Sequence, residues 1–257
     1  MQDHPIFAES LRRIQALLAE RAAADAALAA HLQRLAPPER EVLERCIHSS
    51  GDVSIALDLV FAPAVAPWPS PPGGPPFAAA PVVPAPVSAC DRAVEALQAG
   101  APILTDTAMA AAAVASMARR SFGNPVHCLL DWAPAVAPAG GTRSAAAVDP
   151  AWSALTATAP APLLLIGSAP TALERLLELV AGGMAAPSLL IGMPVGFVGV
   201  AEAKRRLAAS GLAQIRLEGS RGGAALVAAA LNALLRRAWL DQGRPGRSEP
   251  ASPLGWR

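Results

Sequence analysis

The residue best suited to acid–base chemistry in this 257-residue chain is His48. It lies in the segment Cys46-Ile47-His48-Ser49-Ser50-Gly51-Asp52, where a predicted helix gives way to small and polar residues. A histidine in the last turn of a helix commonly interacts with free carbonyl groups and with the helix dipole, which is a structural role. The alternative is a catalytic role, because an imidazole holds or donates a proton near neutral pH.

Two polar residues lie at the carboxyl ends of predicted strands. Asp106 follows the apolar run 103–105, where it would cap the next helix or contact a ligand. Ser168 follows the run 163–166 in the order strand, Gly167, Ser168, Ala169, Pro170. Proline suits an early position of a helix, so Ser168 lies in a tight strand-to-helix turn. Both residues are candidates for ligand binding.

A third candidate site is the predicted helix start at Thr142, Arg143 and Ser144. A helix N-terminus offers unpaired N–H groups and partial positive charge, and an arginine adds a bidentate fork for carboxylates. The structural alternative is a capped helix with Arg143 in solvent. The ligand indicated by the first reading carries carboxylates.

The segment 191–199 is rich in glycine. An apolar run ends on Gly192, turns through Pro194, contains Gly196 and Gly199, and then enters a predicted helix. Three glycines in so short a loop indicate either positive φ angles or a backbone that passes close to a bulky group. Gly196 is therefore a candidate for contact with a ligand, with a plain structural loop as the alternative.

Composition excludes several classes of function. The net charge is +1, aromatic residues make up 4% and tyrosine is absent, which argues against a nucleic-acid-binding protein. The sequence contains no GxGxxG, GxxxxGK[ST], HExxH or GxSxG motif. No sequence motif therefore supports a nucleotide-binding, metalloprotease or hydrolase function. The four histidines are widely separated, so we expect no metal site.

Three features predict a soluble, cytoplasmic protein. Cys46, Cys90 and Cys128 form no CxxC pair, which fits a reducing compartment. The first residues lack the basic and apolar regions of a signal peptide. No apolar stretch reaches the roughly 18 residues that a membrane span needs.

Hydrophobic periodicity predicts an α/β fold behind an N-terminal helical segment. We expect one helix over residues 5–35 and a short helix over 39–46. From residue 91 onward, short apolar runs alternate with helical patterns, which indicates a mainly parallel sheet covered on both faces. The predicted strands are 103–105, 126–130, 163–166, 189–191 and 215–217, and the main helices are 107–120, 171–181, 200–209 and 223–240. Ligands of such sheets bind beyond the carboxyl ends of the strands.

The chain divides into four segments that belong to one domain with additions. Residues 1–62 are the N-terminal helical segment, and residues 89–240 are the α/β core of the same domain. Between them, residues 63–88 form a proline-rich insert, which we expect to be a mobile surface expansion; a ligand for a proline-recognition module is the alternative. Residues 241–257 are a polar tail that we expect to be disordered.

Taken in order, these motifs resemble those of the precorrin-8X methylmutase family of corrin-ring biosynthesis. The resemblance rests on the glycine loop 191–199, the His48 segment running on to Phe61, and the string from Ala99 to Met109, and it covers residues 5–61 and 94–235. It implies a three-layer α/β/α fold, a homodimer and an isomerisation without a cofactor. In that reaction a methyl group migrates from C-11 to C-12 of the macrocycle and gives hydrogenobyrinate, or the corresponding product of the cobalt-containing substrate.

The resemblance also implies roles for individual residues. It makes His48 the catalytic acid, acting on a ring nitrogen of a macrocycle fringed with carboxylates. The residues that it indicates for substrate binding are Asp106, Thr142, Arg143, Ser144, Ser168, Gly196 and Arg221.

The sequence departs from the family pattern in segments expected to bind the substrate. Residues 113–116 replace a Gly-[Ile/Val]-Thr-Arg sequence, and residues 218–224 lack both arginines of an Arg-Gly-Arg-x-Gly-Gly-Ser sequence, although Arg221 could substitute. Ser168 stands where the family has asparagine. Lost arginines favour a catalytically weak protein that binds corrinoid intermediates, whereas His48 and the glycine loop favour the isomerase. An α/β enzyme of unrelated chemistry is the third hypothesis.

Overall fold

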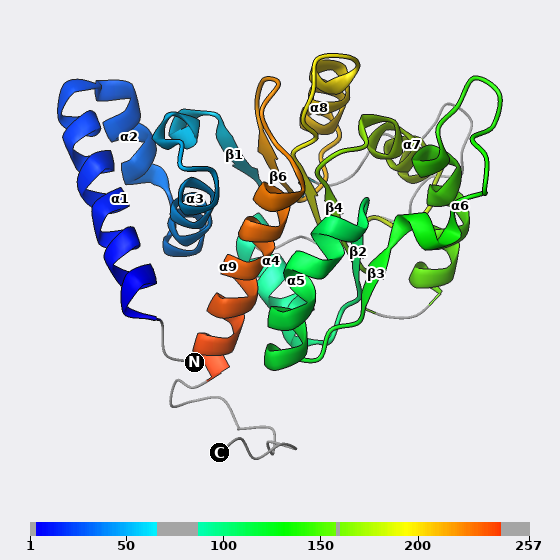
Figure 1. Ribbon diagram of the computed structural model, residues 1–257, viewed down its shortest axis with the longest axis horizontal. Helices are drawn as coiled ribbons and strands as arrows, with labels where there is room; N and C mark the ends of the chain where they lie inside the picture. Colours follow the sequence, from blue (N-terminus) through cyan, green and yellow to red (C-terminus); the bar gives the residue numbers. More distant parts are fainter. Residues whose placement is uncertain (1–3, 66–86, 158–159, 243–257) are drawn as a thin grey trace.

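The structure, a computed structural model, describes residues 4–65, 87–157 and 160–242. A six-stranded sheet lies between two layers of helices (Figure 1). The strand order is β1-β6-β5-β4-β2-β3. The strands are β1 (Leu59–Ala62), β2 (Ile103–Thr105), β3 (Val126–Cys128), β4 (Leu163–Ile166), β5 (Leu189–Gly192) and β6 (Gln214–Leu217).

The helices of the α/β part lie close to the predicted ranges, whereas those of the N-terminal segment differ from them. The helices are α1 (Pro5–Ala24), α2 (Ala26–Arg34), α3 (Pro37–Ser50), α4 (Ala89–Gln98), α5 (Ala108–Ser121), α6 (Arg143–Thr156), α7 (Pro170–Ala181), α8 (Val200–Ala209) and α9 (Ala224–Gln242), with 3-10 helices at Val53–Leu57 and Leu129–Trp132. Several begin at a side-chain cap. The Thr107 and Thr142 hydroxyls accept hydrogen bonds from the N–H groups of Ala110 and Ala145, three residues on.

Strands β2 to β6 are parallel to one another, and β1 pairs with β6 as an antiparallel strand at the edge of the sheet. In the centre, Leu164 of β4 lies between Leu104 of β2 and Leu190 of β5. Because all five parallel strands run in one direction, their carboxyl ends form a single edge of the sheet. The loops that follow them therefore gather on one side of the molecule.

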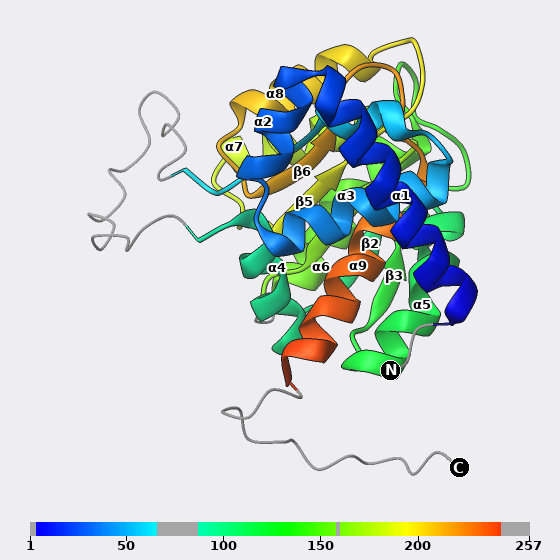
Figure 2. The ribbon, with the colours of Figure 1, turned by 90° about the vertical axis from the view of Figure 1, so that its left-hand side faces the viewer.

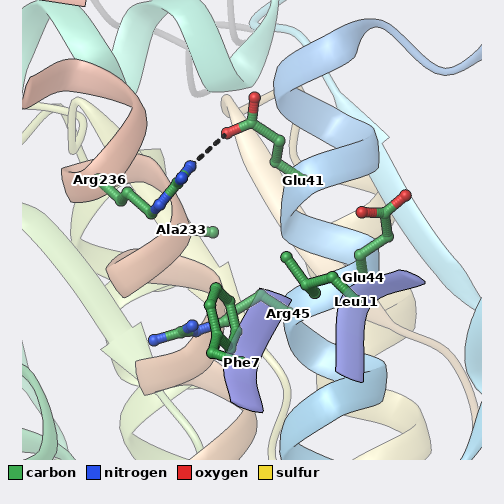
Figure 3. Close-up of a pocket in the computed structure, with 7 residues that line it drawn as sticks. All are labelled: Phe7, Leu11, Glu41, Glu44, Arg45, Ala233 and Arg236. Carbon is green, nitrogen blue, oxygen red and sulfur yellow. Dashed lines mark ion pairs between the residues drawn. The ribbon is translucent and has the colours of Figure 1, made fainter. Parts of the chain in front are cut away.

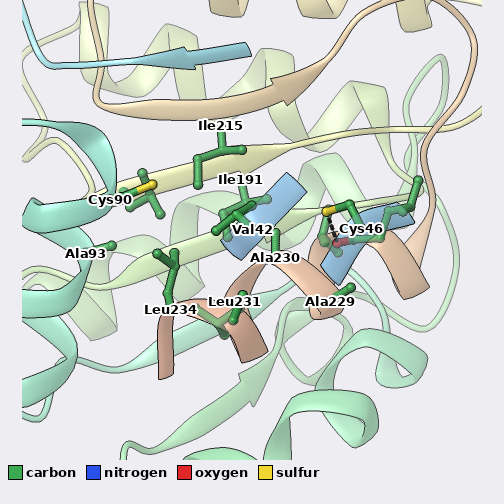
Figure 4. Close-up of a cluster of buried hydrophobic side chains, with 14 of the residues drawn as sticks. Val42, Cys46, Cys90, Ala93, Ile191, Ile215, Ala229, Ala230, Leu231 and Leu234 are labelled. Carbon is green, nitrogen blue, oxygen red and sulfur yellow. Dashed lines mark hydrogen bonds between the residues drawn. The ribbon is translucent and has the colours of Figure 1, made fainter. Parts of the chain in front are cut away.

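Successive side chains of each strand point to opposite faces of the sheet, which creates two separate cores. Leu163 and Leu165 face a cluster that includes α3, α4, α5 and α9, whereas Leu164 and Ile166 face the cluster of α6, α7 and α8. Figure 4 shows the first cluster, where Ile191 of the sheet meets side chains of α3, α4 and α9. Strands buried on both faces have continuous apolar sequences. This arrangement confirms the predicted three-layer α/β/α fold.

Helices α1 to α3 form an additional layer outside α9 (Figure 2). Helix α3 packs directly on α9, and α1 crosses the outside of α3. Leu18 of α1, Leu43 of α3 and Leu234 of α9 belong to the same buried cluster. The N-terminal segment therefore shares its core with the α/β unit.

The predicted single helix over 5–35 is wrong, because the chain breaks at Asp25. The backbone there is extended, and the Asp25 carboxylate accepts hydrogen bonds from the N–H groups of Ala27 and Leu28 at 2.9 and 3.1 Å. A capping aspartate competes with the helical backbone for these donors, so it ends one helix and starts the next. Helix α3 is also longer than the predicted 39–46. It begins with two prolines at Pro37 and ends at Ser50, where Gly51 caps it with φ +68°.

Three smaller predictions also need correction. Residues 59–62 form an antiparallel edge strand that the sequence analysis did not identify, the predicted strand 126–130 ends at Cys128, and α9 extends to Gln242. The predictions for the proline-rich insert and the tail concern residues 66–86 and 243–257, which lie outside the described residues. Within the described ranges, no helix combines the length and apolar character needed to cross a membrane.

Candidate functional site

The candidate site lies along the carboxyl edge of the sheet. Its loops follow β2 at Asp106, β4 at residues 167–169, β5 at residues 193–199 and β6 at residues 218–223. The end of α3, which carries His48, reaches the β6 side of this edge through contacts described below.

Asp106 holds the loop that follows β4. Its buried Oδ2 atom accepts hydrogen bonds from the N–H groups of Gly167, Ser168 and Ala169 at 2.9, 2.5 and 2.9 Å. Burial raises the pKa of this carboxyl above its ordinary value, and the backbone hydrogen bonds oppose that rise. Asp106 thus brings Ser168 to the site. Thr107, rather than Asp106, caps α5.

Glycines allow the loops after β4, β5 and β6 to interlock. A Cβ atom on Gly222 would lie 2.0 Å from the carbonyl oxygen of Met193, and one on Gly167 would lie 2.7 Å from the backbone of Gly223. The Gly223 N–H donates to the same Met193 carbonyl at 2.9 Å. These glycines are therefore required by the close approach of one loop to another.

The loop after β5 also carries exposed apolar residues. Gly196 adopts φ +137°, and its N–H donates to the carbonyl oxygen of Ser220 at 3.0 Å. Beyond it, Phe197 and Val198 are 95% and 88% exposed. The positive φ explains why glycine is needed at position 196.

Arg221 links the loop after β6 to the segment that follows His48. Its guanidinium donates to Asp52 Oδ2 at 2.8 Å and to Ser54 Oγ at 2.6 Å, and it forms a further ion pair with Asp58. Hydrogen bonds from Ser54 to Asp52 are the largest cause that lowers the pKa of the Asp52 carboxyl, and Arg221 adds to the effect. Arg221 therefore binds carboxylates of its own chain.

Lys204 supports this loop from the side of α8. Its side chain is 1% exposed, and Nζ donates to the carbonyl oxygens of Gly219 and Arg221, both at 2.7 Å. Desolvation lowers the pKa of Lys204 to about 8; Glu218 raises it and Arg221 lowers it further. Lys204, Arg221 and Asp52 thus form a connection from α8 to the His48 segment.

His48 lies two residues before the end of α3 and is exposed. Its Nδ1 atom is 2.7 Å from Ser10 Oγ of α1. The ring of Phe7, also on α1, stands edge-on to the imidazole with centroids 5.1 Å apart. The imidazole is therefore held by α1, which the sequence analysis did not associate with it.

The remaining predicted site residues lie on the other side of the glycine loop. Thr142 caps α6, and its hydroxyl is 2.8 Å from that of Thr171 in the first turn of α7. Arg143 is exposed, and its Nε donates to the carbonyl oxygen of Pro134 at 2.8 Å. Ser144 follows in the first turn of α6 and is half-buried.

The structure thus brings the predicted residues together in two groups. His48 and Arg221 lie near β1 and β6, while Asp106, Ser168 and the start of α6 lie near β4 and α7. The loop after β5 joins them, because Val195 N–H donates to the Gly167 carbonyl and Gly196 N–H donates to the Ser220 carbonyl. One edge can therefore contact a broad ligand at several points, with the imidazole at one end.

Sequence reasoning missed Ser10, Phe7 and Lys204. A signal for Lys204 is present, because it occurs in the stripe of α8 that Val200, Ala203 and Leu207 define as buried. Ser10 and Phe7 are three residues apart and so share a face of α1. Nothing in their spacing indicates His48, which is 38 residues from Ser10.

The low pKa of Lys204 predicts a pH-dependent stability. The pKa of an unfolded lysine is about 10.4, so between the two values the unfolded state binds more protons than the folded state. We expect the free energy of unfolding to rise with pH across this interval, by up to about 3 kcal/mol, and the Lys204→Met variant to lack this rise. Denaturant unfolding of both proteins, from neutral pH to above the pKa of unfolded lysine, measures it.

The composition favours this measurement. Lys204 is the single lysine of the sequence and tyrosine is absent. The pKa values of the three buried cysteines are raised, but their contribution is common to both proteins and cancels in the difference. Parallel curves for the two proteins would contradict the prediction.

Comparisons with known proteins identify the relatives of this chain. A family model described as precorrin-8X methylmutase matches residues 76–237. A cobalt-precorrin-8 methylmutase of Synechocystis is 34% identical over 93% of this chain and 98% of its own length. A precorrin-8X methylmutase of Pseudomonas aeruginosa is 40% identical over 74% of this chain and 80% of its own length. The solved structure of precorrin-8X methylmutase from Thermus thermophilus superposes with a TM-score of 0.68 at 32% identity, covering 94% of this chain and all of that one.

Proposed function

This chain belongs to the precorrin-8X methylmutase family of isomerases, and from that premise we propose that it moves a methyl group from C-11 to C-12 of precorrin-8X or of its cobalt-containing counterpart. The product is hydrogenobyrinate or the cobalt-containing equivalent. One methyl–carbon bond breaks and another forms, so substrate and product are isomers. The chemistry required of the protein is to hold the pigment and to supply and recover a proton.

The observation that carries this proposal is the connection of His48 to the carboxyl edge of the sheet. Arg221 of the loop after β6 binds Asp52 and Ser54, which lie four and six residues after His48. This contact ties the segment that follows the exposed His48 to one of the loops where ligands of parallel sheets bind. We assign His48 the role of acid toward a ring nitrogen of the pigment.

We assign the binding of the pigment to the start of α6 and the loops after β4 and β5. Free N–H groups at a helix N-terminus and the Arg143 guanidinium suit the carboxylates of the macrocycle. Thr142, Ser144, Ser168 and Gly196 complete this surface. Asp106 and Arg221 position the loops, because the carboxylate of the first and the guanidinium of the second bind groups of the chain itself.

We propose further that the protein works as a cytoplasmic homodimer. The free, buried cysteines Cys46, Cys90 and Cys128 suit a reducing compartment. The exposed Phe197 and Val198 offer apolar surface for association. Light scattering of the purified protein tests the dimer, which a molecular mass near 26.1 kDa would contradict.

The test of the function is the visible spectrum of purified protein incubated with precorrin-8X and, separately, with cobalt-precorrin-8. We expect one pigment to change to the spectrum of its rearranged product with turnover beyond one equivalent. Binding of both pigments without conversion would instead identify a corrinoid-binding protein. This is the alternative favoured by the changes at residues 113–116 and 218–224. Absence of binding would contradict both functions.

A further inference from the structure

We propose that Ser10 of α1 is a positioning residue that fixes the His48 imidazole so that Nε2 carries the exchangeable proton. This inference rests on the proposed role of His48. It follows from the contact between Ser10 Oγ and His48 Nδ1, which are 2.7 Å apart.

One turn of α1 holds the imidazole in two ways. Ser10 bonds one ring nitrogen, and Phe7 meets the ring edge-on at an interplanar angle of 88°. Phe7 and Ser10 are three residues apart on a helix and so present a common face to α3. A hydrogen bond and a ring contact together restrict both rotation and tilt of the imidazole.

Helix α1 is itself fixed at this point. The Arg45 guanidinium of α3 lies 4.3 Å from the centre of the Phe7 ring. Figure 3 shows Arg45 and Phe7 side by side at one end of a small pocket between α1, α3 and α9, with the ion pair between Arg236 and Glu41 at the other end. Arg45 precedes His48 by three residues, so one turn of α3 supplies both the histidine and the cation that holds Phe7.

The chemical consequence concerns the tautomer of His48. A neutral imidazole has one nitrogen that donates and one that accepts. An Nδ1–H that donates to the Ser10 hydroxyl therefore leaves Nε2 as the nitrogen that releases and recovers a proton. The hydroxyl accepts this hydrogen bond in both the imidazolium and the neutral form, so the contact persists in both states. The imidazolium passes its Nε2 proton to a ring nitrogen of the pigment and becomes a neutral imidazole with its hydrogen on Nδ1. The proton returns to Nε2 after methyl migration, leaving no net change in the protein.

The experiment compares Ser10→Ala and Ser10→Thr with the wild type. Alanine removes the hydroxyl, and we expect kcat to fall about 10-fold while KM changes less than about twofold, because orientation of the acid is lost and pigment binding is kept. Threonine retains the hydroxyl and should restore most of kcat. The matched control is Ser121→Ala, since the Ser121 hydroxyl bonds the Met117 carbonyl of its own helix α5 and no part of the site.

A spectroscopic readout separates positioning from a merely structural role. In protein labelled with ¹⁵N-histidine, at a pH where imidazole is neutral, we expect His48 as the Nδ1–H tautomer in the wild type and as a mixture in Ser10→Ala. The His48→Gln variant identifies the signal. Alanine favours helices, so unfolding of Ser10→Ala should occur at or above the wild-type temperature.

Each outcome decides the proposal. Unchanged kcat and an unchanged tautomer in Ser10→Ala would overturn it, as would a rise in KM alone, which would make Ser10 a pigment-binding residue. Full activity of His48→Gln would overturn the proposed function of His48 instead, whatever the tautomer shows. If Ser10→Ala failed to fold, the Ser10→Thr variant would decide the proposal. A wild-type tautomer and kcat in Ser10→Thr would support it, whereas a mixed tautomer of His48 with full kcat would overturn it.

Discussion

Replacement of His48 by glutamine is expected to lower kcat for the methyl migration by about 10²- to 10⁴-fold, the usual contribution of a positioned general acid. Glutamine keeps a side chain that can form hydrogen bonds but cannot supply the proton. Because Arg143, Ser168 and the loop after β5 lie in other elements, binding of the pigment should be nearly unchanged. Single-turnover absorbance spectra and a pigment titration measure the two quantities separately.

The histidine substitution should leave the fold intact. His48 is exposed, so its replacement creates no cavity, and the temperature of unfolding should stay close to that of the wild type. His4→Asn is a suitable control, because it removes another histidine and keeps a capping side chain at the start of α1. Turnover by His48→Gln at the wild-type rate would assign His48 the structural role at the end of α3.

The second large effect is expected at Gly222, whose replacement by alanine should separate the loops after β5 and β6. The new Cβ would lie 2.0 Å from the carbonyl oxygen and 2.7 Å from the carbonyl carbon of Met193. Both groups belong to backbone, so neither can rotate away as a side chain would. We expect the free energy of unfolding to fall on the order of 3 kcal/mol, with loss of pigment binding.

A variant in the same loop provides the control for Gly222→Ala. Gly219 has φ +73°, and its added Cβ would meet no atom within 4 Å, so Gly219→Ala costs only backbone strain of about 1 to 2 kcal/mol. Urea unfolding of the two variants and the wild type distinguishes contact from strain. Equal losses of stability would show that the loops do not depend on the close approach at Gly222.

Much of the fold was determined by local features of the sequence. Helix α8 has the predicted bounds, Val200–Ala209, because its apolar stripe and flanking glycine are properties of ten neighbouring residues. The strands at 103–105 and 163–166 were predicted because burial on both faces produces continuous apolar runs. The break at Asp25 was missed, because a capping aspartate inside a long apolar pattern is a weak signal against the helical period.

The candidate site was only partly accessible to such reasoning. The sequence and its resemblance to a family indicated His48, the glycine loop and the start of α6 as chemically important. Their assigned roles in binding and catalysis stay predictions that the experiments above test. The resemblance implies a substrate fringed with carboxylates, and a chain with a net charge of +1 has to recognise them through local groups.

Only the tertiary structure decided which side chains meet. Asp106 accepts hydrogen bonds from residues 61 to 63 positions later, and Arg221 binds Asp52 across 169 positions. Ser10 reaches His48 because α1 lies across α3. Hydrophobic period and capping are set by neighbours within a few residues, whereas these contacts depend on how layers of helices pack on the sheet. For this reason the sequence by itself determined the elements and the candidate acid, and the packing determined what holds that acid in place.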